Sequence, residues 1–433
     1  MLDLLSKIFI EPLQYEFMQR AVIESVLIGI TCGLVGAFIM LRRMSLIGDA
    51  LAHAVLPGVI IGFMIAGKGQ VAMFIGAVTA GISTSLMIGF INRNSRIKED
   101  TSIGVMFTGA FALGVLLVSQ LKNVHIDLTS YLFGDILGVS NDDLILSGII
   151  AVVVILSVLL FYKQLVVTSF DPTMAAVMGI STGVVHYFLM SLLSMTIVAS
   201  LQSVGLILVV AMLITPSATA YLLTDRLPKM LMLAVFFAVF TALVGLLGSY
   251  HFNFASGASM VVFATVVFLI TLIVSPSHGV LVKYIRRRKV AEKHLAQDIL
   301  KMIYKKCYDE NKIKSLRDAV SIEELATWMG SPSKRILTLA DKLSRENLVT
   351  VDNGNICLTA SGEKYSLRII RSHRLWESYL INEKILTENN IHSDAEEFEH
   401  ILTEDLLDEI DQKLGYPKYD PHGSPIPQKN GDV

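Results

Sequence analysis

The sequence predicts an all-α polytopic membrane protein of about nine transmembrane helices, followed by a smaller α+β domain that lies in water. Of its 433 residues, 53% are hydrophobic and 17% are charged, whereas about 25% of a soluble domain is charged. The mean hydropathy is +0.59. Residues 1–290 hold 17 Lys and Arg against 13 Asp and Glu, and residues 291–433 hold 19 against 25. The first part therefore suits lipid and the second suits water, which excludes one large globular enzyme.

Nine stretches are long and apolar enough to cross a bilayer, because a spanning helix needs about 20 mainly apolar residues. They are residues 18–40, 49–66, 70–91, 102–119, 143–162, 183–199, 203–222, 229–249 and 256–274. Residues 1–17 mix charged side chains with leucines and have no small-residue cleavage site. We expect an interfacial amphipathic segment there rather than a signal peptide.

The basic residues of the short loops predict the orientation, because Lys and Arg accumulate on the cytoplasmic side of a membrane. The loops after the odd-numbered spans carry most of them: Arg42, Arg43, Arg93, Arg96, Lys98, Lys163, Arg226, Lys229 and residues 286–289. The opposite loops hold only Lys68 and Lys122. The sequence therefore predicts an N-terminus outside the cell and a C-terminal domain in the cytoplasm.

Two ionisable residues stand at the start of the second predicted span. Asp49 and His53 are four residues apart, so they share one face of a helix. Ionisable groups in lipid are costly and usually mark a pathway or a ligand site, and imidazole with carboxylate suits a divalent first-row metal. The alternative is a pair that merely fixes a helix end. Pro57 and Gly58 follow one turn later and predict a kink or hinge beside a cavity.

The loop after the fifth span predicts a short free-standing helix. Asp171 can cap it, Pro172 can take its first position, and Gly179 can end it. Such an element on the cytoplasmic side suits the transmission of force from a soluble motor. An ordinary interfacial helix is the alternative.

Taken together, these segments resemble the signature segments of ABC-3-type permeases, the membrane subunits of bacterial importers for manganese, zinc and iron. The resemblance covers nearly all of residues 15–280. The segments that carry it are Leu46–Gly58 (LIGDALAHAVLPG), Glu99–Gly104 (EDTSIG), Tyr131–Asp135 (YLFGD), Phe170–Gly179 (FDPTMAAVMG) and Thr215–Ala220 (TPSATA).

The resemblance implies a bacterial cell-membrane permease that works with a cytoplasmic ABC ATPase, an extracellular metal-binding lipoprotein and a second permease, either another copy or a related chain. It implies that Asp49 and His53 coordinate the transported Mn²⁺, or Zn²⁺ or Fe²⁺. The ATPase-coupling helix is then formed by Asp171, Pro172, Ala175, Ala176 and Gly179. No phosphate-binding loop occurs in the sequence, so we expect no ATP hydrolysis by this chain and no tightly bound cofactor.

The C-terminal part predicts a winged helix over residues 296–360, after a basic linker at 281–295. A helix at 297–308 is followed by a helix–turn–helix and by two β-like runs, 348–351 and 356–358. Asn353 and Gly354 separate those runs, and Asn-Gly between two strands is a hairpin signal.

Residues 361–433 carry the segments His373–Glu377 (HRLWE), Ala395–His400 (AEEFEH) and Pro421–Pro427 (PHGSPIP). With the winged helix they resemble the iron- and manganese-dependent repressors of the DtxR type, which implies a helical dimerisation and metal-binding region. The metal ligands of those repressors would fall on Asp298, His373, Glu377, Glu396, Glu399 and His400. Lys301 stands where a manganese-type repressor has a second carboxylate, so we expect an altered or weaker site for Mn²⁺ or Fe²⁺.

Two functions from different classes follow. The first is a divalent-metal permease, with manganese favoured by the fused domain, whose C-terminal part senses metal and regulates uptake or only dimerises the chain. The second is a membrane-anchored, metal-responsive transcriptional regulator. The net charge of −6 over residues 291–433 counts against DNA binding, which needs a positive surface. We therefore expect the permease and no nucleic-acid partner.

Overall fold

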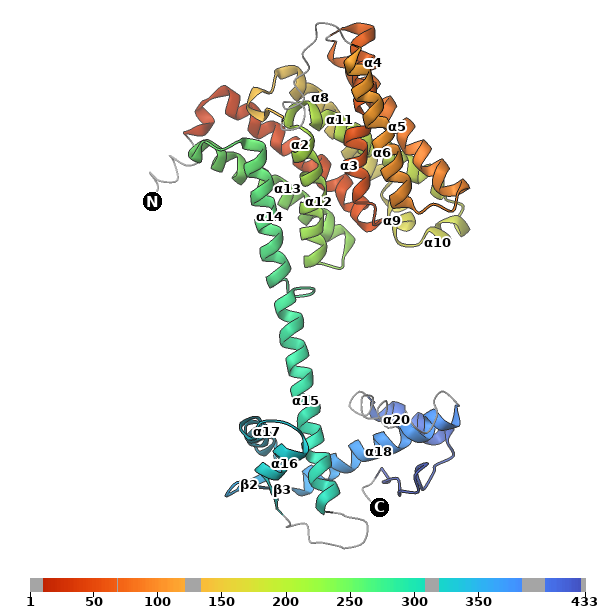
Figure 1. Ribbon diagram of the computed structural model, residues 1–433, viewed down its shortest axis with the longest axis vertical. Coiled ribbons are helices and arrows are strands. Elements are labelled where there is room, and N and C mark those ends of the chain that lie inside the picture. Colours follow the sequence, from red (N-terminus) through yellow and green to blue (C-terminus); the bar gives the residue numbers. More distant parts are fainter. Residues whose placement is uncertain (1–10, 68, 121–133, 308–318, 384–401, 430–433) are drawn as a thin grey trace. The chain divides into compact units, whose positions relative to one another are not determined.

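The computed structural model describes residues 11–67, 69–120, 134–307, 319–383 and 402–429, and the chain divides into two compact units. The first unit is Met1–Lys283 and the second is Tyr284–Val433 (Figure 1). Helix α15 (Val280–Cys307) begins in the first unit and ends in the second.

The described part of the first unit has nine helical stretches long and apolar enough to cross a membrane, as the sequence predicts. In chain order they are α2 (Glu16–Leu41), α3 with α4 (Leu46–Ala54 and Leu56–Ala66), α5 (Gln70–Asn94), α6 (Glu99–Ser119), α8 (Asn141–Leu160), α11 (Thr182–Val204), α12 (Leu206–Leu223), α13 (Leu227–Phe252) and α14 (Ser256–Val274). Two 3₁₀ turns, η2 (Pro12–Gln14) and η3 (Ile136–Gly138), precede α2 and α8. The chain is therefore an all-α multi-pass membrane protein in this unit.

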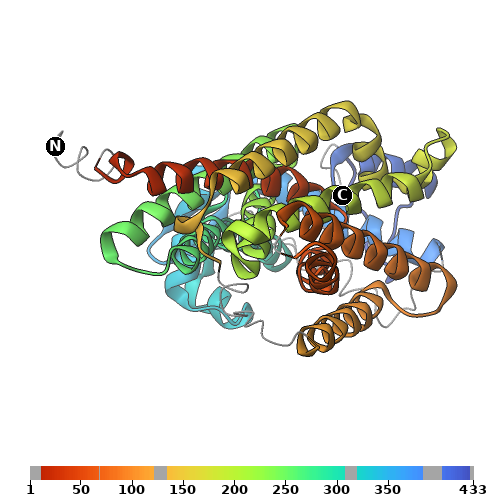
Figure 2. The ribbon, with the colours of Figure 1, turned by 90° about the horizontal axis from the view of Figure 1, so that it is seen from above.

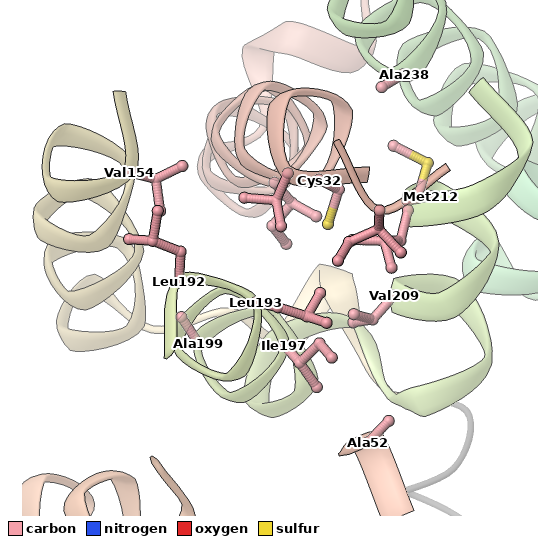
Figure 3. Packing of buried hydrophobic residues seen from close by; sticks show 14 of the residues in the cluster. Cys32, Ala52, Val154, Leu192, Leu193, Ile197, Ala199, Val209, Met212 and Ala238 are labelled. Carbon is pink, nitrogen blue, oxygen red and sulfur yellow. The ribbon is translucent and has the colours of Figure 1, made fainter. Parts of the chain in front are cut away.

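Helix α2 lies at the centre of the first unit and packs against α8, α12 and α13. In Figure 2 the red helix α2 lies beside the gold helix α8. Gly29 and Gly33 let α2 approach α13 closely, because a Cβ on either would lie within 3.0 Å of α13 backbone atoms. Cys32, Leu193 and Met212 meet in one buried cluster contributed by α2, α11 and α12 (Figure 3).

The second span is divided in two at Val55, the residue between α3 and α4. Pro57 follows at the beginning of α4 and has no backbone N–H to donate to the turn before it. Gly58 has a further structural reason to be glycine. A Cβ there would lie 2.1 Å from the carbonyl oxygen of Gly76, so α4 and α5 pack backbone against backbone.

The segment between the fifth and sixth spans holds two helices, of which the sequence predicted one. Helix α9 (Tyr162–Phe170) continues from α8 after a break at Phe161, and α10 (Pro172–Val177) follows after Asp171. Lys163 and Gln164 end the apolar run, which is why the sequence suggests a loop there. Residues 162–170 contain no Gly or Pro to stop a helix, so α9 forms nonetheless.

The second unit contains the predicted helix–turn–helix and hairpin. Its elements are α15, β1 (Val320–Ser321), α16 (Ile322–Trp328), α17 (Ser333–Arg345), β2 (Val349–Asp352) and β3 (Asn355–Leu358). The three strands form an antiparallel sheet in the order β1-β3-β2, with Val349 opposite Leu358 and Asp352 opposite Asn355. Asn353 and Gly354 both have positive φ, of 45° and 79°, as the two-residue turn requires. Strand β1 was not predicted.

The unit closes with α18 (Ala360–Asn382) and α20 (Glu404–Lys413). Ser366 of α18 donates to the carbonyl of Leu300 on α15 at 3.1 Å. Arg371 of α18 donates to Asp411 of α20 at 2.6 Å, which joins the two helices. The predicted basic linker at 281–295 lies inside α15, which starts 17 residues before the predicted helix because residues 280–307 contain no Gly or Pro.

Candidate metal centre and coupling helix

Asp49 lies in the first turn of α3 and His53 in its last turn. The His53 Nε2 and Asp49 Oδ1 atoms are 3.7 Å apart, which is too long for a hydrogen bond but close enough to share a ligand. The Asp49 side chain is 49% exposed and that of His53 is 19% exposed. The pair therefore has one accessible carboxylate and one largely covered imidazole.

The His53 ring is held by two aromatic rings of α6. Its centroid is 5.0 Å from that of Phe107 and 5.3 Å from that of Phe111. Its Nδ1 atom is buried and has no hydrogen-bond partner in the described part of the chain. A buried polar atom without a partner is costly, so this nitrogen is suited to hold a water, while Nε2 is the ring nitrogen that faces Asp49.

A complete metal site is not formed by the described residues of one chain, among which no cluster of three or more His, Cys, Asp or Glu side chains occurs. First-row divalent metals take at least four ligands. Asp49 and His53 supply two kinds of donor that suit such an ion. The remaining ligands would have to come from water or from another chain.

Glu24 is a second carboxyl group inside the first unit, on α2. It is fully buried, and its Oε1 accepts a hydrogen bond from Ser147 Oγ of α8 at 2.7 Å. This contact joins α2 to α8. None of the described interactions joins Glu24 to Asp49 or His53.

The exposed helix α10 has the local structure that the sequence predicts. Asp171 accepts a hydrogen bond from the backbone N–H of Met174 at 2.9 Å, and Pro172 takes the first helical position. Gly179 follows the helix with φ of 76°, and Ala175 is buried. Other apolar side chains of this segment are exposed: Phe170, Met174, Val177 and Met178. A capped helix with an exposed apolar face is suited to contact another protein.

In the second unit, the structure brings two of the predicted ligands together and adds a cation. His373 Nε2 is 3.1 Å from Glu377 Oε1, and both side chains are buried. The other ring nitrogen, Nδ1, is 3.5 Å from the Nζ atom of Lys301, which is 6% exposed. Asp298 lies one turn before Lys301 on α15. The predicted ligands Glu396, Glu399 and His400 lie outside the described residues.

This arrangement fits a divalent ion poorly between α15 and α18. Both nitrogens of the His373 ring already have neighbours, one of them the Lys301 ammonium. A divalent cation beside that ammonium would be repelled, and the repulsion is weakly screened at a buried position. A metal could join His373 and Glu377 only after Lys301 moved away.

Nine apolar spans, an ionisable pair in the second span and an exposed capped helix between spans define a multi-pass membrane protein of the transport class. Residues 14–275 match the family described as the ABC 3 transport family, and the chain belongs to that family. Residues 359–428 match the iron dependent repressor, metal binding and dimerisation domain. The resemblance to a permease fused to a repressor-like domain is thus confirmed.

Several proteins named for metal transport match the first unit over almost their whole length. The manganese transport system membrane protein MntC of Listeria monocytogenes is 51% identical over 286 residues, which are 66% of this chain and 100% of that protein. Its namesake from Halalkalibacterium halodurans is 48% identical over 284 residues, 66% of this chain and 96% of that one. A probable iron transport system membrane protein of Haemophilus influenzae is 41% identical over 263 residues, 61% and 95% of the two chains.

A solved structure supports the fold of the first unit. PsaBC from Streptococcus pneumoniae, in complex with Fab, matches with a TM-score of 0.59 and 39% identity over 66% of this chain and 99% of the other.

Proposed function

We propose that this chain is the permease subunit of an ATP-binding-cassette importer for a divalent transition metal, and that the metal is manganese. The observation that carries the proposal is the Asp49–His53 pair, in which an accessible carboxylate lies 3.7 Å from the Nε2 atom of a largely covered imidazole. The relatives named for manganese transport favour manganese as the cargo, and a relative named for iron transport keeps iron as the alternative. Zinc also binds such donors.

The cargo ion would be held by Asp49 and His53 together with donors from a second permease, because one chain supplies too few ligands. The division of the second span at Val55 supports a hinge at Pro57 and Gly58, through which α3 and α4 change their relative angle. Movement of α3 would expose the ion first to one side of the membrane and then to the other. The energy would come from ATP hydrolysis by a partner subunit.

The exposed helix α10 is the proposed docking element for that ATPase. Its apolar side chains at Met174 and Val177 would enter a groove of the partner, while the buried Ala175 anchors the helix to its own unit. This assignment requires that α10 faces the cytoplasm, as the basic loops predict, with the N-terminus outside. An extracellular metal-binding lipoprotein would deliver the ion on the opposite side.

Metal uptake in cells that carry wild type or D49A tests the proposal. We expect D49A to abolish manganese accumulation, since this chain then loses the carboxylate that it gives to the site. The matched control is D225A, because Asp225 also pairs with a histidine, His278 at 2.9 Å, but is 77% exposed outside the spans. Unchanged manganese, zinc and iron accumulation in D49A would remove the core of the proposal.

We further propose that the second unit regulates uptake from the cytoplasm. Its support is the match of residues 359–428 to a repressor metal-binding domain. A regulatory Mn²⁺ or Fe²⁺ would be held chiefly by Glu396, Glu399 and His400, where it would neutralise clustered negative charge. We expect uptake by wild type to fall as cytosolic manganese rises, and uptake by a chain that ends at Arg288 to continue. Normal shut-off in the shortened chain would refute this role.

A further inference from the structure

The turn between the first two spans is tied to the segment that leads into α10 by one side chain, Arg42. Arg42 follows the last residue of α2 and is half-buried. Its Nη2 donates to Thr168 Oγ1 at 2.8 Å, and its Nε donates to Ser169 Oγ at 3.2 Å. Both hydroxyl groups belong to α9, about 126 residues further along the chain. No local sequence pattern predicts this contact.

The hydroxyl groups are arranged to receive these bonds. Thr168 Oγ1 donates its own proton to the carbonyl of Gln164 at 2.7 Å, and Ser169 Oγ donates to the carbonyl of Leu165 at 2.6 Å. A hydroxyl has one proton and two lone pairs, so each oxygen is left with acceptor capacity toward Arg42. The two bonds are therefore fixed in direction and leave side by side from one edge of the rigid guanidinium group, the edge formed by Nε and Nη2.

The hydrogen bonds of Arg42 go to these two hydroxyl groups and not to an acid, although Glu99 lines the same cavity. In the described part of the chain, Arg42 takes part in no ion pair within 4.0 Å. Burial lowers the pKa of Arg42 to about 10, so the group is still charged at neutral pH. A partly buried cation held only by two hydroxyl groups gains little stability from its position, which favours a role other than stabilising the fold.

The contact borders a cavity of about 370 Å³ that reaches the first residue of α10. Arg42, Thr168, Ser169 and Pro172 all line it. Atoms around a cavity are free to shift without overpacking, so this region can accommodate movement of α9 and α10.

The chain path connects Arg42 to the metal ligands through a short, hydrogen-bonded turn. The backbone N–H groups of Arg42 and Met44 donate to the carbonyls of Phe38 and Ile39 at 3.1 Å each, and Arg43 adopts the left-handed conformation with φ of 60°. Helix α3 starts at Leu46, and Asp49 is seven residues from Arg42. On the other side, Ser169 is two residues from Asp171, which caps α10.

We propose that Arg42 is a positioning residue that couples movement of α10 to movement of α3, and hence to the Asp49–His53 pair. The proposal rests on the proposed function as an importer permease. When an ATPase shifts α10, the α9 hydroxyl groups carry Arg42 with them, and the rigid turn passes the displacement to the start of α3. Without this contact, ATP hydrolysis continues but moves the metal ligands less effectively.

The test is the ratio of manganese transported to ATP hydrolysed, in liposomes that contain the full chain with its ATPase and binding protein. We expect R42A and the shape-preserving T168V/S169A variant each to lower this ratio at least fivefold, with ATP hydrolysis within twofold of wild type. The triple variant should lose no more than R42A alone, because all three changes remove one contact. Additive losses, or a ratio equal to that of wild type, overturn the proposal.

R43N is the matched control, because it removes the neighbouring positive charge from the same cavity and asparagine tolerates the left-handed conformation of Arg43. It should keep the wild-type ratio, and an equal loss in R43N would show that only the charge of the cavity matters.

Hydrogen exchange of the full chain in nanodiscs separates failure of this coupling from failure of the proposed function, since it needs no transport. R42A should raise amide exchange in both α9 and the first turn of α3, and R43N in neither. Faster exchange in only one of the two segments would show that Arg42 does not link them.

Discussion

Replacing Lys301 with Glu should create a divalent-metal site in the second unit. The Lys301 ammonium is buried and lies 3.5 Å from His373 Nδ1, while Glu377 lies 3.1 Å from the other ring nitrogen. A carboxylate at position 301 would add an oxygen donor next to the Nδ1 atom of His373, in place of the ammonium. Carboxylates with imidazole form the donor set that Mn²⁺ and Fe²⁺ prefer.

The size of the effect follows from the charges. A divalent ion about 4 Å from an ammonium is repelled by roughly 8 kcal/mol at an effective dielectric constant of 20, and a carboxylate in the same place attracts it by a similar amount. Desolvation of the carboxylate opposes most of this change. If only about 1.4 kcal/mol remains, the affinity rises tenfold. We therefore expect K301E to bind Mn²⁺ at least ten times more tightly at this site than the wild-type sequence does.

Equilibrium dialysis of the full chain in detergent, followed by elemental analysis, measures the bound Mn²⁺. D49A serves as the background, so that the transport site does not contribute. K301E should bind one more ion per chain than its parent, and the uncharged K301M variant, which removes the repulsion without adding a ligand, should lie between them. Equal binding by all three would show that Lys301 does not control metal access.

Three further predictions concern packing and local structure. G58V should destabilise the first unit by about 1–3 kcal/mol, seen as a lower thermal midpoint in detergent, because its Cβ would lie 2.1 Å from the carbonyl oxygen of Gly76. G104A should leave that midpoint unchanged, because outside its own helix backbone and chain neighbours no heavy atom lies within 4 Å of the added Cβ. The same thermal midpoint in both variants would contradict the close packing of α4 on α5. D171A removes the cap of α10, which should lower the stability of that short helix by about 1 kcal/mol and speed the exchange of its amide hydrogens accordingly. Exchange at the wild-type rate would mean that the helix does not need the cap. G354A should cost the second unit about 1–2 kcal/mol, measured by denaturant unfolding, because φ of 79° strains a residue with a Cβ, and no loss of stability would show that the hairpin adapts.

The first unit could be predicted largely from local pattern. Each span is a run of apolar residues whose length is fixed by the bilayer, so the sequence from 18 to 274 predicts their number and order. The signals that begin and end α10 are equally local. Asp171 caps the helix, Pro172 takes its first position and Gly179 follows its end, and each acts on residues only a few positions away. The Asn353-Gly354 turn of the second unit is predictable for the same reason.

Local patterns do not predict contacts between segments that are far apart in the sequence. Helix α9 was missed because its polar residues resemble a loop, although they include the acceptors for Arg42. Gly58 suggests a hinge by its sequence position, and its close approach to Gly76 becomes evident only when α4 and α5 are packed together. Strand β1 has two residues, too few for a recognisable strand pattern in the sequence. It is defined by its pairing with β3, about 35 residues later in the chain.

The sequence by itself determined the membrane class of this protein, its family, the division into an apolar and a charged part, and the residue types that can bind a divalent ion. Composition, helical spacing and motif order are properties of the chain and need no packing. Only the tertiary structure decided how those residues are used. It left His53 Nδ1 buried without a partner, put the Lys301 ammonium beside His373, and joined Arg42 to α9. These features depend on burial and on the distance between remote side chains, which folding alone sets.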